Sequence, residues 1–304
     1  MNQFNNIQDV IRYFTEDKCQ STLEKMRWPD GRIVCPKCGV KGAYRNSDCK
    51  TYKCKSKTCK ARFSITVGTV MEGTKLPLSK WFTAIYLITA HKKGISSLQL
   101  GRDLGIGQKA AWFVNHRIRL MLKDCADNPL SNVVEIDETY VGGKWANMSK
   151  KKRAIMIEKQ QSNKVPVMGM VQRDGNAKLT VIGRNTFKEA IRQNVSTNAF
   201  IVTDEHLGYR GLNMEFADHA SVNHSQQEFV RDDIHTNNVE GFFSLFKRMI
   251  FGTYHQISPK HLQRYCDEIL YRFNNRKVKD VDRFMNSLSH TEGRLTYNQL
   301  TEKK

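Results

Sequence analysis

The sequence predicts an α/β fold in which one large domain follows two small modules. From about Asn132 to residue 250, strand-like and helical segments alternate, as they do when helices cover a sheet. Before this domain lie a cysteine-rich segment without aliphatic periodicity and a run of helical periodicity from Leu78 to about Lys123. A chain of 304 residues is long enough for one large domain with smaller appendages.

We expect the chain to divide into five parts. A short amphipathic helix opens it, because Ile7, Val10, Ile11 and Phe14 recur at helical spacing. In chain order the parts are a helical lead-in at 1–30, the cysteine-rich module at 31–70, a trihelical unit at 78–124, the large domain at 132–275 with a basic insertion at 144–164, and a helical tail at 276–304.

The composition is strongly basic. Lysine and arginine total 49 against 30 acidic residues, which gives a formal net charge of +19. This balance favours a polyanionic partner, with nucleic acid the leading candidate over a ribosomal partner or basicity for solubility alone. No stretch approaches the roughly 18 to 20 apolar residues of a membrane span, and the N-terminus lacks a signal-peptide pattern. We expect a soluble cytoplasmic protein, associated with the nucleoid through DNA and not with a membrane.

Cysteines in the first module form a candidate zinc site. A C-x-x-C pair followed by glycine makes a tight knuckle in which two thiolates face one ion, and a second pair follows. A structural zinc ion would stabilise a segment that buries little apolar surface, so we predict a zinc ribbon at 31–70 in preference to a redox motif. The predicted ligands are Cys35, Cys38, Cys54 and Cys59. Cys49 is close enough to substitute for either member of the second pair.

Two short helices separated by a glycine turn at 105–107 form a candidate helix-turn-helix. Ser96 and Gln99 are spaced as a capping box, so the first helix is expected to start there and the second near Gln108. The second helix has one apolar stripe, and its remaining residues are expected to face outward. Its predicted DNA contacts are Gln108, Lys109, Asn115, Arg117 and Arg119, with His116 on the same outward face. An ordinary helical hairpin with a basic, solvated face is the alternative.

The segment at 144–164 interrupts the large domain. It holds seven lysines and arginines and one acid, Glu158. We expect a solvated loop or an insertion that faces DNA. The candidate DNA contacts within it are Lys150, Lys151, Lys152 and Arg153.

Three acidic residues of the large domain are candidates for catalysis. Asp137 lies on a strand that alternates apolar and acidic residues. Asp204 follows the apolar run AFIVT, at the carboxyl end of a predicted central strand, where α/β folds place their chemistry. Glu240 lies on a helix away from its apolar stripe, and Lys247 shares that face two turns later.

Phosphodiester chemistry explains such a trio. Carboxylates can hold two Mg²⁺ ions about 3.5 to 4 Å apart, which activate the attacking oxygen and stabilise the leaving oxygen, while a nearby lysine grips a phosphate. Hard oxygen ligands favour Mg²⁺ or Mn²⁺, in contrast to the thiolate site. Because the chain has 30 carboxylates, other acids are plausible substitutes, namely Glu135, Glu138, Glu205 and Asp218.

Three segments of the large domain carry a family resemblance. EIDETYVGGK, IVTDEHLGYRGL and HTNNVEGFFSLFKRMIFGTYHQ together resemble the DDE transposases of prokaryotic insertion sequences that are related to eukaryotic Merlin elements. CPKCG, the stretch at 68–78 and the KGIS run resemble the same group, so the resemblance covers about residues 20 to 275. It implies an RNase H-like catalytic domain, a mixed sheet flanked by helices, preceded by the zinc ribbon and the helix-turn-helix. It also implies Mg²⁺-dependent cleavage at the ends of a mobile element and transfer of the 3′-hydroxyl strand ends into target DNA.

The resemblance assigns roles to individual residues. The positions that match the first, second and third acid and the following basic residue are Asp137, Asp204, Glu240 and Lys247. Some relatives use asparagine in the third role, which leaves Asn237 or Asn238 as rival or additional ligands and His235 as a group near the metals or DNA. Phe243 stands where many relatives have tryptophan, a conservative change.

Three functions fit these observations. The first is an active transposase that acts on double-stranded DNA, at terminal inverted repeats and at a target, as a homodimer or higher assembly. The second is a DNA-binding regulator without enzymatic activity, in which the acidic domain serves only for dimerisation. The third is a nuclease or Holliday-junction resolvase, which shares the carboxylates and the metal but not the joining of strands.

Overall fold

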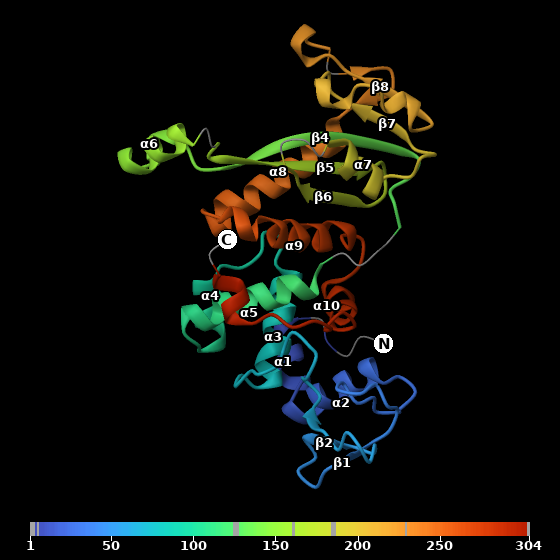
Figure 1. Cartoon of the computed structure of the whole chain (residues 1–304), viewed down its shortest axis with the longest axis vertical. Helices are drawn as coiled ribbons and strands as arrows, with labels where there is room; N and C mark the ends of the chain where they lie inside the picture. The colour runs from blue at the N-terminus through green and yellow to red at the C-terminus, as the bar shows by residue number, and fades with distance from the viewer. Residues whose placement is uncertain are drawn as a thin grey trace. The chain divides into compact units, whose positions relative to one another are not determined.

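The computed structural model describes Phe4 and residues 6–123, 128–159, 162–183, 187–228 and 230–302 (Figure 1). The chain divides into two compact units, Met1–Lys123 with Lys277–Lys304 and Asp124–Arg276. The segment predicted as a helical tail therefore packs within the first unit. Its helix α10 (Asp280–Leu288) lies against α3 (Leu78–Ala90), where the ring of Phe284 contacts Phe82 and Tyr86.

Helix α2 and the cysteine-rich segment pack together. Helices α1 (Ile7–Tyr13) and α2 (Glu16–Arg27) precede a small antiparallel sheet of strands β1 (Ala43–Arg45), β2 (Thr51–Cys54) and β3 (Arg62–Ser64). Glu24 of α2 accepts hydrogen bonds from the Tyr52 hydroxyl and from Arg45, and Trp28 packs edge-on against Tyr52 at 5.2 Å. Helix α2 and Trp28 after it thus provide polar and aromatic contacts that support the short strands.

Helices α4 (Ser97–Leu104) and α5 (Gln108–Met121) occupy the positions predicted for the helix-turn-helix. Helix α4 begins where the Ser96 hydroxyl accepts a hydrogen bond from the Gln99 N–H at 3.1 Å, which is one half of the predicted capping box. The Gln99 side chain instead donates to Asp103 at 2.7 Å. It ends at Gly105, whose φ of +63° is the left-handed conformation that glycine adopts without strain. The two-helix geometry is present, and its role in DNA binding stays a prediction.

The expectation that the polar residues of α5 all face outward is wrong. Four of them are at most 4% exposed, namely Asn115, His116, Arg117 and Arg119. Gln108 and Lys109 in the first turn are exposed, beside a hollow of about 250 Å³ that Ser97 and Trp112 also line.

Arg117 shows how a basic residue of this helix is accommodated inside the first unit. Its guanidinium stacks on Trp81 at 5.1 Å, and its Nη2 donates a hydrogen bond to the Glu72 carbonyl at 2.5 Å. Burial lowers the pKa of Arg117 to about 10. Asn115 likewise turns inward and donates from Nδ2 to the Ile95 carbonyl at 3.4 Å. Helix α5 is therefore buried over more than its apolar stripe. Its inward polar side chains can be buried because they donate hydrogen bonds to backbone carbonyls.

The second unit is built on a five-stranded mixed sheet. The strands are β4 (Val133–Gly142), β5 (Lys164–Gln172), β6 (Ala177–Val181), β7 (Phe200–Thr203) and β8 (Asp218–Ser221), in the order β6-β5-β4-β7-β8. Pairing is antiparallel between β4, β5 and β6 and parallel between β4, β7 and β8. The α/β fold with a mixed sheet, as the family resemblance implied, is confirmed.

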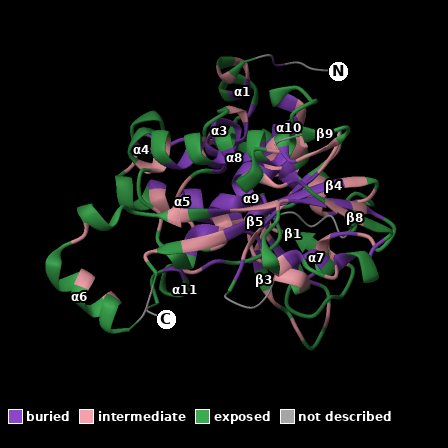
Figure 2. Cartoon of the chain, turned by 90° about the horizontal axis from the view of Figure 1, so that it is seen from above, coloured by how far each residue is buried: buried purple, intermediate pink, exposed green. Residues whose placement is uncertain are grey.

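Helices cover both faces of this sheet. On one face, α7 (Phe187–Asn194) contributes Ala190 and Ile191 to a core with Val134 and Ile136 of β4. On the other face, α8 (Asn237–Met249) and α9 (Leu262–Asn274) pack against valines of β5 in a second core. Strand β4 lies at the centre of the sheet, and Figure 2 shows it partly buried and partly intermediate. Of its acids, Glu135 is buried against the start of α8, whereas Asp137 and Glu138 are half-buried.

The basic insertion extends the β4–β5 hairpin. It consists of a 3-10 turn at Trp145–Asn147 and helix α6 (Lys150–Glu158), which lies beyond the end of the sheet (Figure 1). No residue of α6 is buried, and Figure 2 shows the helix as exposed. Lys150, Lys151 and Lys152 are exposed, whereas Arg153 is half-buried and donates from Nη2 to the Trp145 carbonyl at 2.8 Å. Arg153 therefore closes the insertion on itself.

Shorter elements complete the described chain. They are the strands β9 (Val230–Arg231) and β10 (Ile234–His235), the helix α11 (Tyr297–Thr301), a π-helical turn at Ile250–Tyr254, and 3-10 turns at Leu207–Tyr209, Leu212–Met214, His224–Gln226 and Pro259–His261. Among the described residues no helix combines the length and the apolar character that crossing a membrane requires.

Candidate active site and metal centres

Asp137 and Asp204 come together where β4 and β7 run side by side. The parallel ladder pairs Glu135 with Val202, and the same register continued by two residues places Asp137 beside Asp204. The carboxylate oxygens of these two residues and of Glu138 lie within 4.8 Å of one another. All three residues are half-buried. The structure thus gathers two of the predicted acids and adds Glu138, which the sequence offered only as a substitute.

The charge state of Asp137 reflects this crowding. Burial, together with the charges of Asp204, Glu138 and Glu240, raises the pKa of Asp137 to about 7, although the Glu138 N–H donates to its Oδ1 at 2.7 Å and opposes the shift. A cation bound here would stabilise the ionised form of Asp137, because its positive charge offsets the cost of burial and the repulsion from the neighbouring acids. The donor set consists of hard oxygens and fits Mg²⁺ or Mn²⁺.

The Tyr209 side chain and the His206 backbone N–H, both after β7, hold Glu138 and Asp204. The hydroxyl of Tyr209, which is 1% exposed, donates to Glu138 Oε2 at 2.6 Å. Burial and the adjacent Glu138 raise the pKa of Tyr209 well above its usual range, so the hydroxyl remains a donor. The N–H of His206 donates to Asp204 Oδ1 at 3.1 Å. One loop therefore orients acids from two strands.

Glu240 approaches this group from α8. It is exposed in the first turn of the helix, and its Oε1 accepts a hydrogen bond from the Thr236 hydroxyl at 2.9 Å. Among the described residues its carboxylate lies outside the group formed by Asp137, Glu138 and Asp204, yet its charge contributes to the raised pKa of Asp137. Lys247 is exposed further along α8.

The remaining candidates at the start of α8 differ in their contacts. Asn238 donates from Nδ2 to Glu135 Oε1 at 2.7 Å, and His235 places Nδ1 3.3 Å from the same oxygen. Both face Glu135, a buried acid, rather than the group around Asp137. Asn237 is exposed. Of the other acids, Glu205 accepts hydrogen bonds from Ser225, and Asp218 is exposed on β8.

A glycine lets α8 lie close to the strand that carries Asp137. Gly169 of β5 is the antiparallel partner of Asp137, and a Cβ added to it would meet two ring atoms of Phe243 at 2.7 Å and Cγ2 of Val239 at 3.1 Å. The aromatic position noted in the sequence therefore packs directly on the backbone beside the acids. Helix α8 could not approach the sheet this closely over a larger residue.

We expect Gly169→Ala to destabilise the protein by about 1 to 3 kcal/mol, because the new methyl group would force α8 away from the sheet. Urea denaturation monitored by circular dichroism measures the change. Gly143→Ala is the matched control, since nothing lies within 4 Å of a Cβ there, and it should leave stability nearly unchanged. Equal stability of the two variants would contradict the close packing of Phe243.

The cysteine cluster is assembled as a four-sulfur site. The Sγ atoms of the four predicted ligands lie within 4.8 Å of one another, with Cys35 and Cys59 3.9 Å apart and Cys38 and Cys54 3.6 Å apart. Gly39 follows the first pair with a φ of +72°, which turns the chain back toward the site. Cys49 is exposed outside this cluster. Four soft donors in two pairs fit tetrahedral zinc.

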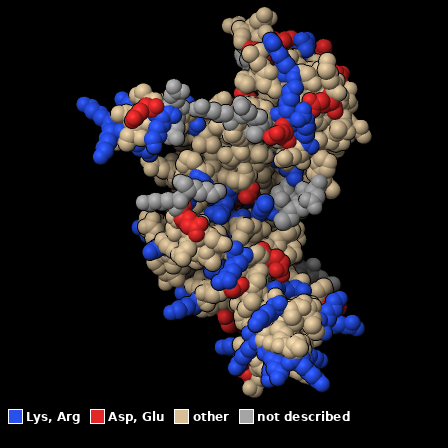
Figure 3. All heavy atoms as spheres, viewed as in Figure 1, with Lys and Arg blue, Asp and Glu red and all other residues tan. Residues whose placement is uncertain are grey.

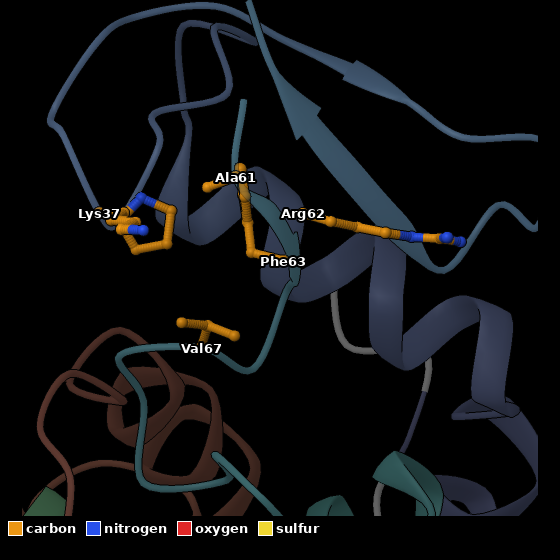
Figure 4. A pocket seen from close by; sticks show the side chains of 6 residues that line it. Lys37, Ala61, Arg62, Phe63 and Val67 are labelled. Carbon is orange, nitrogen blue, oxygen red and sulfur yellow. The ribbon is translucent and has the colours of Figure 1, made fainter. Parts of the chain in front are cut away.

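The surroundings of the cysteine cluster are basic and hollowed. Lysine and arginine side chains crowd the part of the surface formed by the ribbon (Figure 3). A hollow of about 330 Å³ lies beside the first knuckle, lined by Pro36, Lys37, Ala61, Arg62, Phe63 and Val67 (Figure 4). The guanidinium of Arg62 points out of the hollow and pairs with Asp48 at 2.9 Å. The acids of the second unit do not line this hollow.

Comparisons with known proteins match a part of each unit. A model described as the ISXO2-like transposase domain matches residues 129–274, and one described as the transposase zinc-ribbon domain matches residues 14–62. The chain is 25% identical over 258 residues to an uncharacterized protein in transposable element ISH50 of Halobacterium salinarum, across 79% of this chain and 85% of that protein. It is 28% identical over 94 residues to an uncharacterized transposase-like protein of Haemophilus influenzae, across 31% of this chain and 75% of that protein. The zinc-ribbon match and the cysteine cluster together support structural zinc.

Proposed function

We propose, from the matches to a transposase domain and to a transposase zinc ribbon, that this chain is a transposase of the prokaryotic insertion-sequence type. It cleaves DNA at the ends of its element and joins the 3′-hydroxyl ends to target DNA. The observation that carries the proposal is the proximity of the Asp137, Glu138 and Asp204 carboxylates, which lie within 4.8 Å of one another. These acids lie at the carboxyl end of β7, where open α/β sheets bind their ligands.

In this proposal Asp137 and Asp204 hold the catalytic metals. When bound there, Mg²⁺ or Mn²⁺ would activate the attacking oxygen and stabilise the leaving oxygen of the phosphodiester. Glu240 is proposed as the third ligand, because it matches the third acid of the family motif and stands in the first turn of α8, where its charge acts on Asp137. Asn238 is a weaker candidate, since its amide nitrogen already bonds to Glu135. Asn237, exposed in the first turn of α8, remains the rival ligand.

DNA contacts are proposed on three basic surfaces. Lys247 would grip a phosphate near the acids, and the exposed lysines 150–152 of α6 would contact the backbone beyond the sheet. Gln108 and Lys109 would contact DNA from the start of α5, whereas Arg117 is committed to Trp81 and Glu72. We propose that two or more copies act together on paired ends.

The test is a product assay with purified protein, Mg²⁺ or Mn²⁺, and a labelled duplex that carries the terminal sequence of the element. An active transposase should release the 3′-hydroxyl end and join it to a supercoiled target plasmid. Cleaved ends without joined products would instead identify a nuclease or resolvase. Binding without cleavage under either metal would identify a DNA-binding regulator and overturn the proposal.

A further inference from the structure

A fully buried carboxylate links the strand of Asp137 to the helix of Glu240. Glu135 of β4 is 0% exposed and points to the same face of the sheet as Asp137, two residues later. Its Oε2 accepts hydrogen bonds from the backbone N–H groups of Asn238 at 2.8 Å and Val239 at 3.2 Å, in the first turn of α8. Glu135 therefore caps a helix that begins about 100 residues later in the chain.

The second carboxylate oxygen of Glu135 accepts hydrogen bonds from side chains at the same contact. Its Oε1 accepts hydrogen bonds from Arg173 Nε at 2.8 Å and from Asn238 Nδ2 at 2.7 Å. Arg173 also donates from Nη2 to the carbonyls of Asp233 at 2.6 Å and His235 at 3.3 Å. The arginine thus ties the segment before α8 to the carboxylate that caps the helix.

These bonds account for a buried charge that would otherwise be unfavourable. A carboxylate removed from water needs hydrogen-bond donors and an opposite charge, and Glu135 receives donors on both oxygens together with the Arg173 guanidinium. The positive end of the α8 dipole favours a negative charge at the same place. Helix α8 is therefore held on β4 by hydrogen bonds of defined geometry as well as by apolar packing.

We propose that Glu135 is a positioning residue that sets where Glu240 stands relative to Asp137. This inference rests on the proposed function. Along β4, Asp137 lies two residues or about 7 Å from Glu135, and along α8, Glu240 lies two residues after Asn238. If the start of α8 moves relative to β4, the distance between Asp137 and Glu240 changes. The metal affinity of the site therefore depends on Glu135, although Glu135 touches no metal.

Glutamine at position 135 could not accept all of the hydrogen bonds that the Glu135 carboxylate accepts. Glutamine has one acceptor oxygen where glutamate has two. In Glu135→Gln the amide nitrogen must face either the two α8 N–H groups or the pair from Arg173 and Asn238, and one pair of donors loses its partner. The substitution keeps the side-chain volume and removes one of the two pairs of hydrogen bonds that hold the start of α8 and the segment before it to β4.

The experiment compares Glu135→Gln with Glu268→Gln in the full-length protein. Glu268 of α9 is also 0% exposed and pairs with an arginine, Arg272, at 2.6 Å, so it controls for the loss of a buried ion pair. Isothermal titration calorimetry with Mn²⁺ measures metal affinity without any requirement for activity. Plasmid nicking at increasing Mg²⁺ and Mn²⁺, and thermal melting without added Mg²⁺ or Mn²⁺, complete the set.

We expect Glu135→Gln to weaken Mn²⁺ binding by about 10- to 100-fold, the range found for residues that orient metal ligands. Nicking should recover at high Mn²⁺, and DNA binding should stay unchanged. Glu268→Gln should lower the melting temperature but keep the wild-type metal dependence. Equal metal affinity in the two variants would overturn the positioning role. If the wild-type protein bound Mn²⁺ but cut no DNA, the proposed function would fail while the calorimetric comparison still decided the role of Glu135.

Discussion

Asp137→Asn is expected to slow cleavage of element-end DNA by on the order of 10³-fold or more, the size of effect seen when a group that acts in the transition state is lost. Asparagine keeps the size of aspartate but cannot carry the negative charge that the site shares among Asp137, Glu138 and Asp204. Single-turnover cleavage under Mg²⁺ and under Mn²⁺ measures the loss. Zinc content should be unchanged, because the site lies in a separate unit from the ribbon. DNA binding should be unchanged, because the substitution leaves every proposed basic contact in place.

The matched control is Asp218→Asn, which removes an exposed acid from β8 of the same sheet. This variant should cleave at the wild-type rate. A cleavage rate for Asp137→Asn that equals the rate of the Asp218 control would refute the assignment of Asp137. Asp204→Asn provides a second arm, since the two acids lie side by side and both are proposed to hold the metals.

The same Asp137→Asn substitution should stabilise the metal-free protein. An acid whose pKa is raised from 3.8 to about 7 in the folded state binds more protons when folded than when unfolded between those two values, so stability falls as pH rises through this window and levels off above it. The shift corresponds to at most about 4 kcal/mol. Melting without added Mg²⁺ or Mn²⁺ should show the variant above wild type at about pH 8, with the gap closing as the pH falls toward 4.

The acids illustrate how far sequence reasoning reached. Asp204 was predicted from its place at the carboxyl end of an apolar strand, and the structure puts it there, after β7. Glu138 was not singled out, because neighbours on a strand point to opposite faces. Pairing of β4 with β7 ends at Glu135 and Val202 while β4 continues to Gly142. Beyond the paired region, side chains from both faces of β4 can reach the same edge.

Contacts between segments far apart in the sequence explain why the periodicity of the sequence did not predict the burial of some charged residues. Periodicity along α5 showed one apolar stripe, but Arg117 meets Trp81 and Glu72, which lie far earlier in the chain, so its burial was not visible locally. The donors to Glu135 likewise come from the start of α8. Local spacing predicted the strands, the helices and the ligand types, whereas burial of charged residues depended on partners that only the fold supplies.

The cysteine module carries the second large expected effect. Cys54→Ser should lose zinc and unfold the ribbon, because metal binding and folding are coupled in such small modules and contribute on the order of 10 kcal/mol. The strands β1, β2 and β3 have only three or four residues each and need the metal as a common anchor. A colorimetric zinc assay on the purified protein, together with limited proteolysis of the N-terminal unit, measures both consequences.

Cys49→Ser is the control that separates a structural ligand from a nearby thiol. Cys49 is exposed outside the four-sulfur cluster, so its replacement should keep the zinc and the protease resistance of the wild type. Loss of zinc from Cys49→Ser with retention in Cys54→Ser would reassign the second ligand pair. Because α2 packs on β2 through Glu24 and Tyr52, unfolding of the ribbon should also expose α2, and new cleavage sites between residues 16 and 27 would mark the extent of the module.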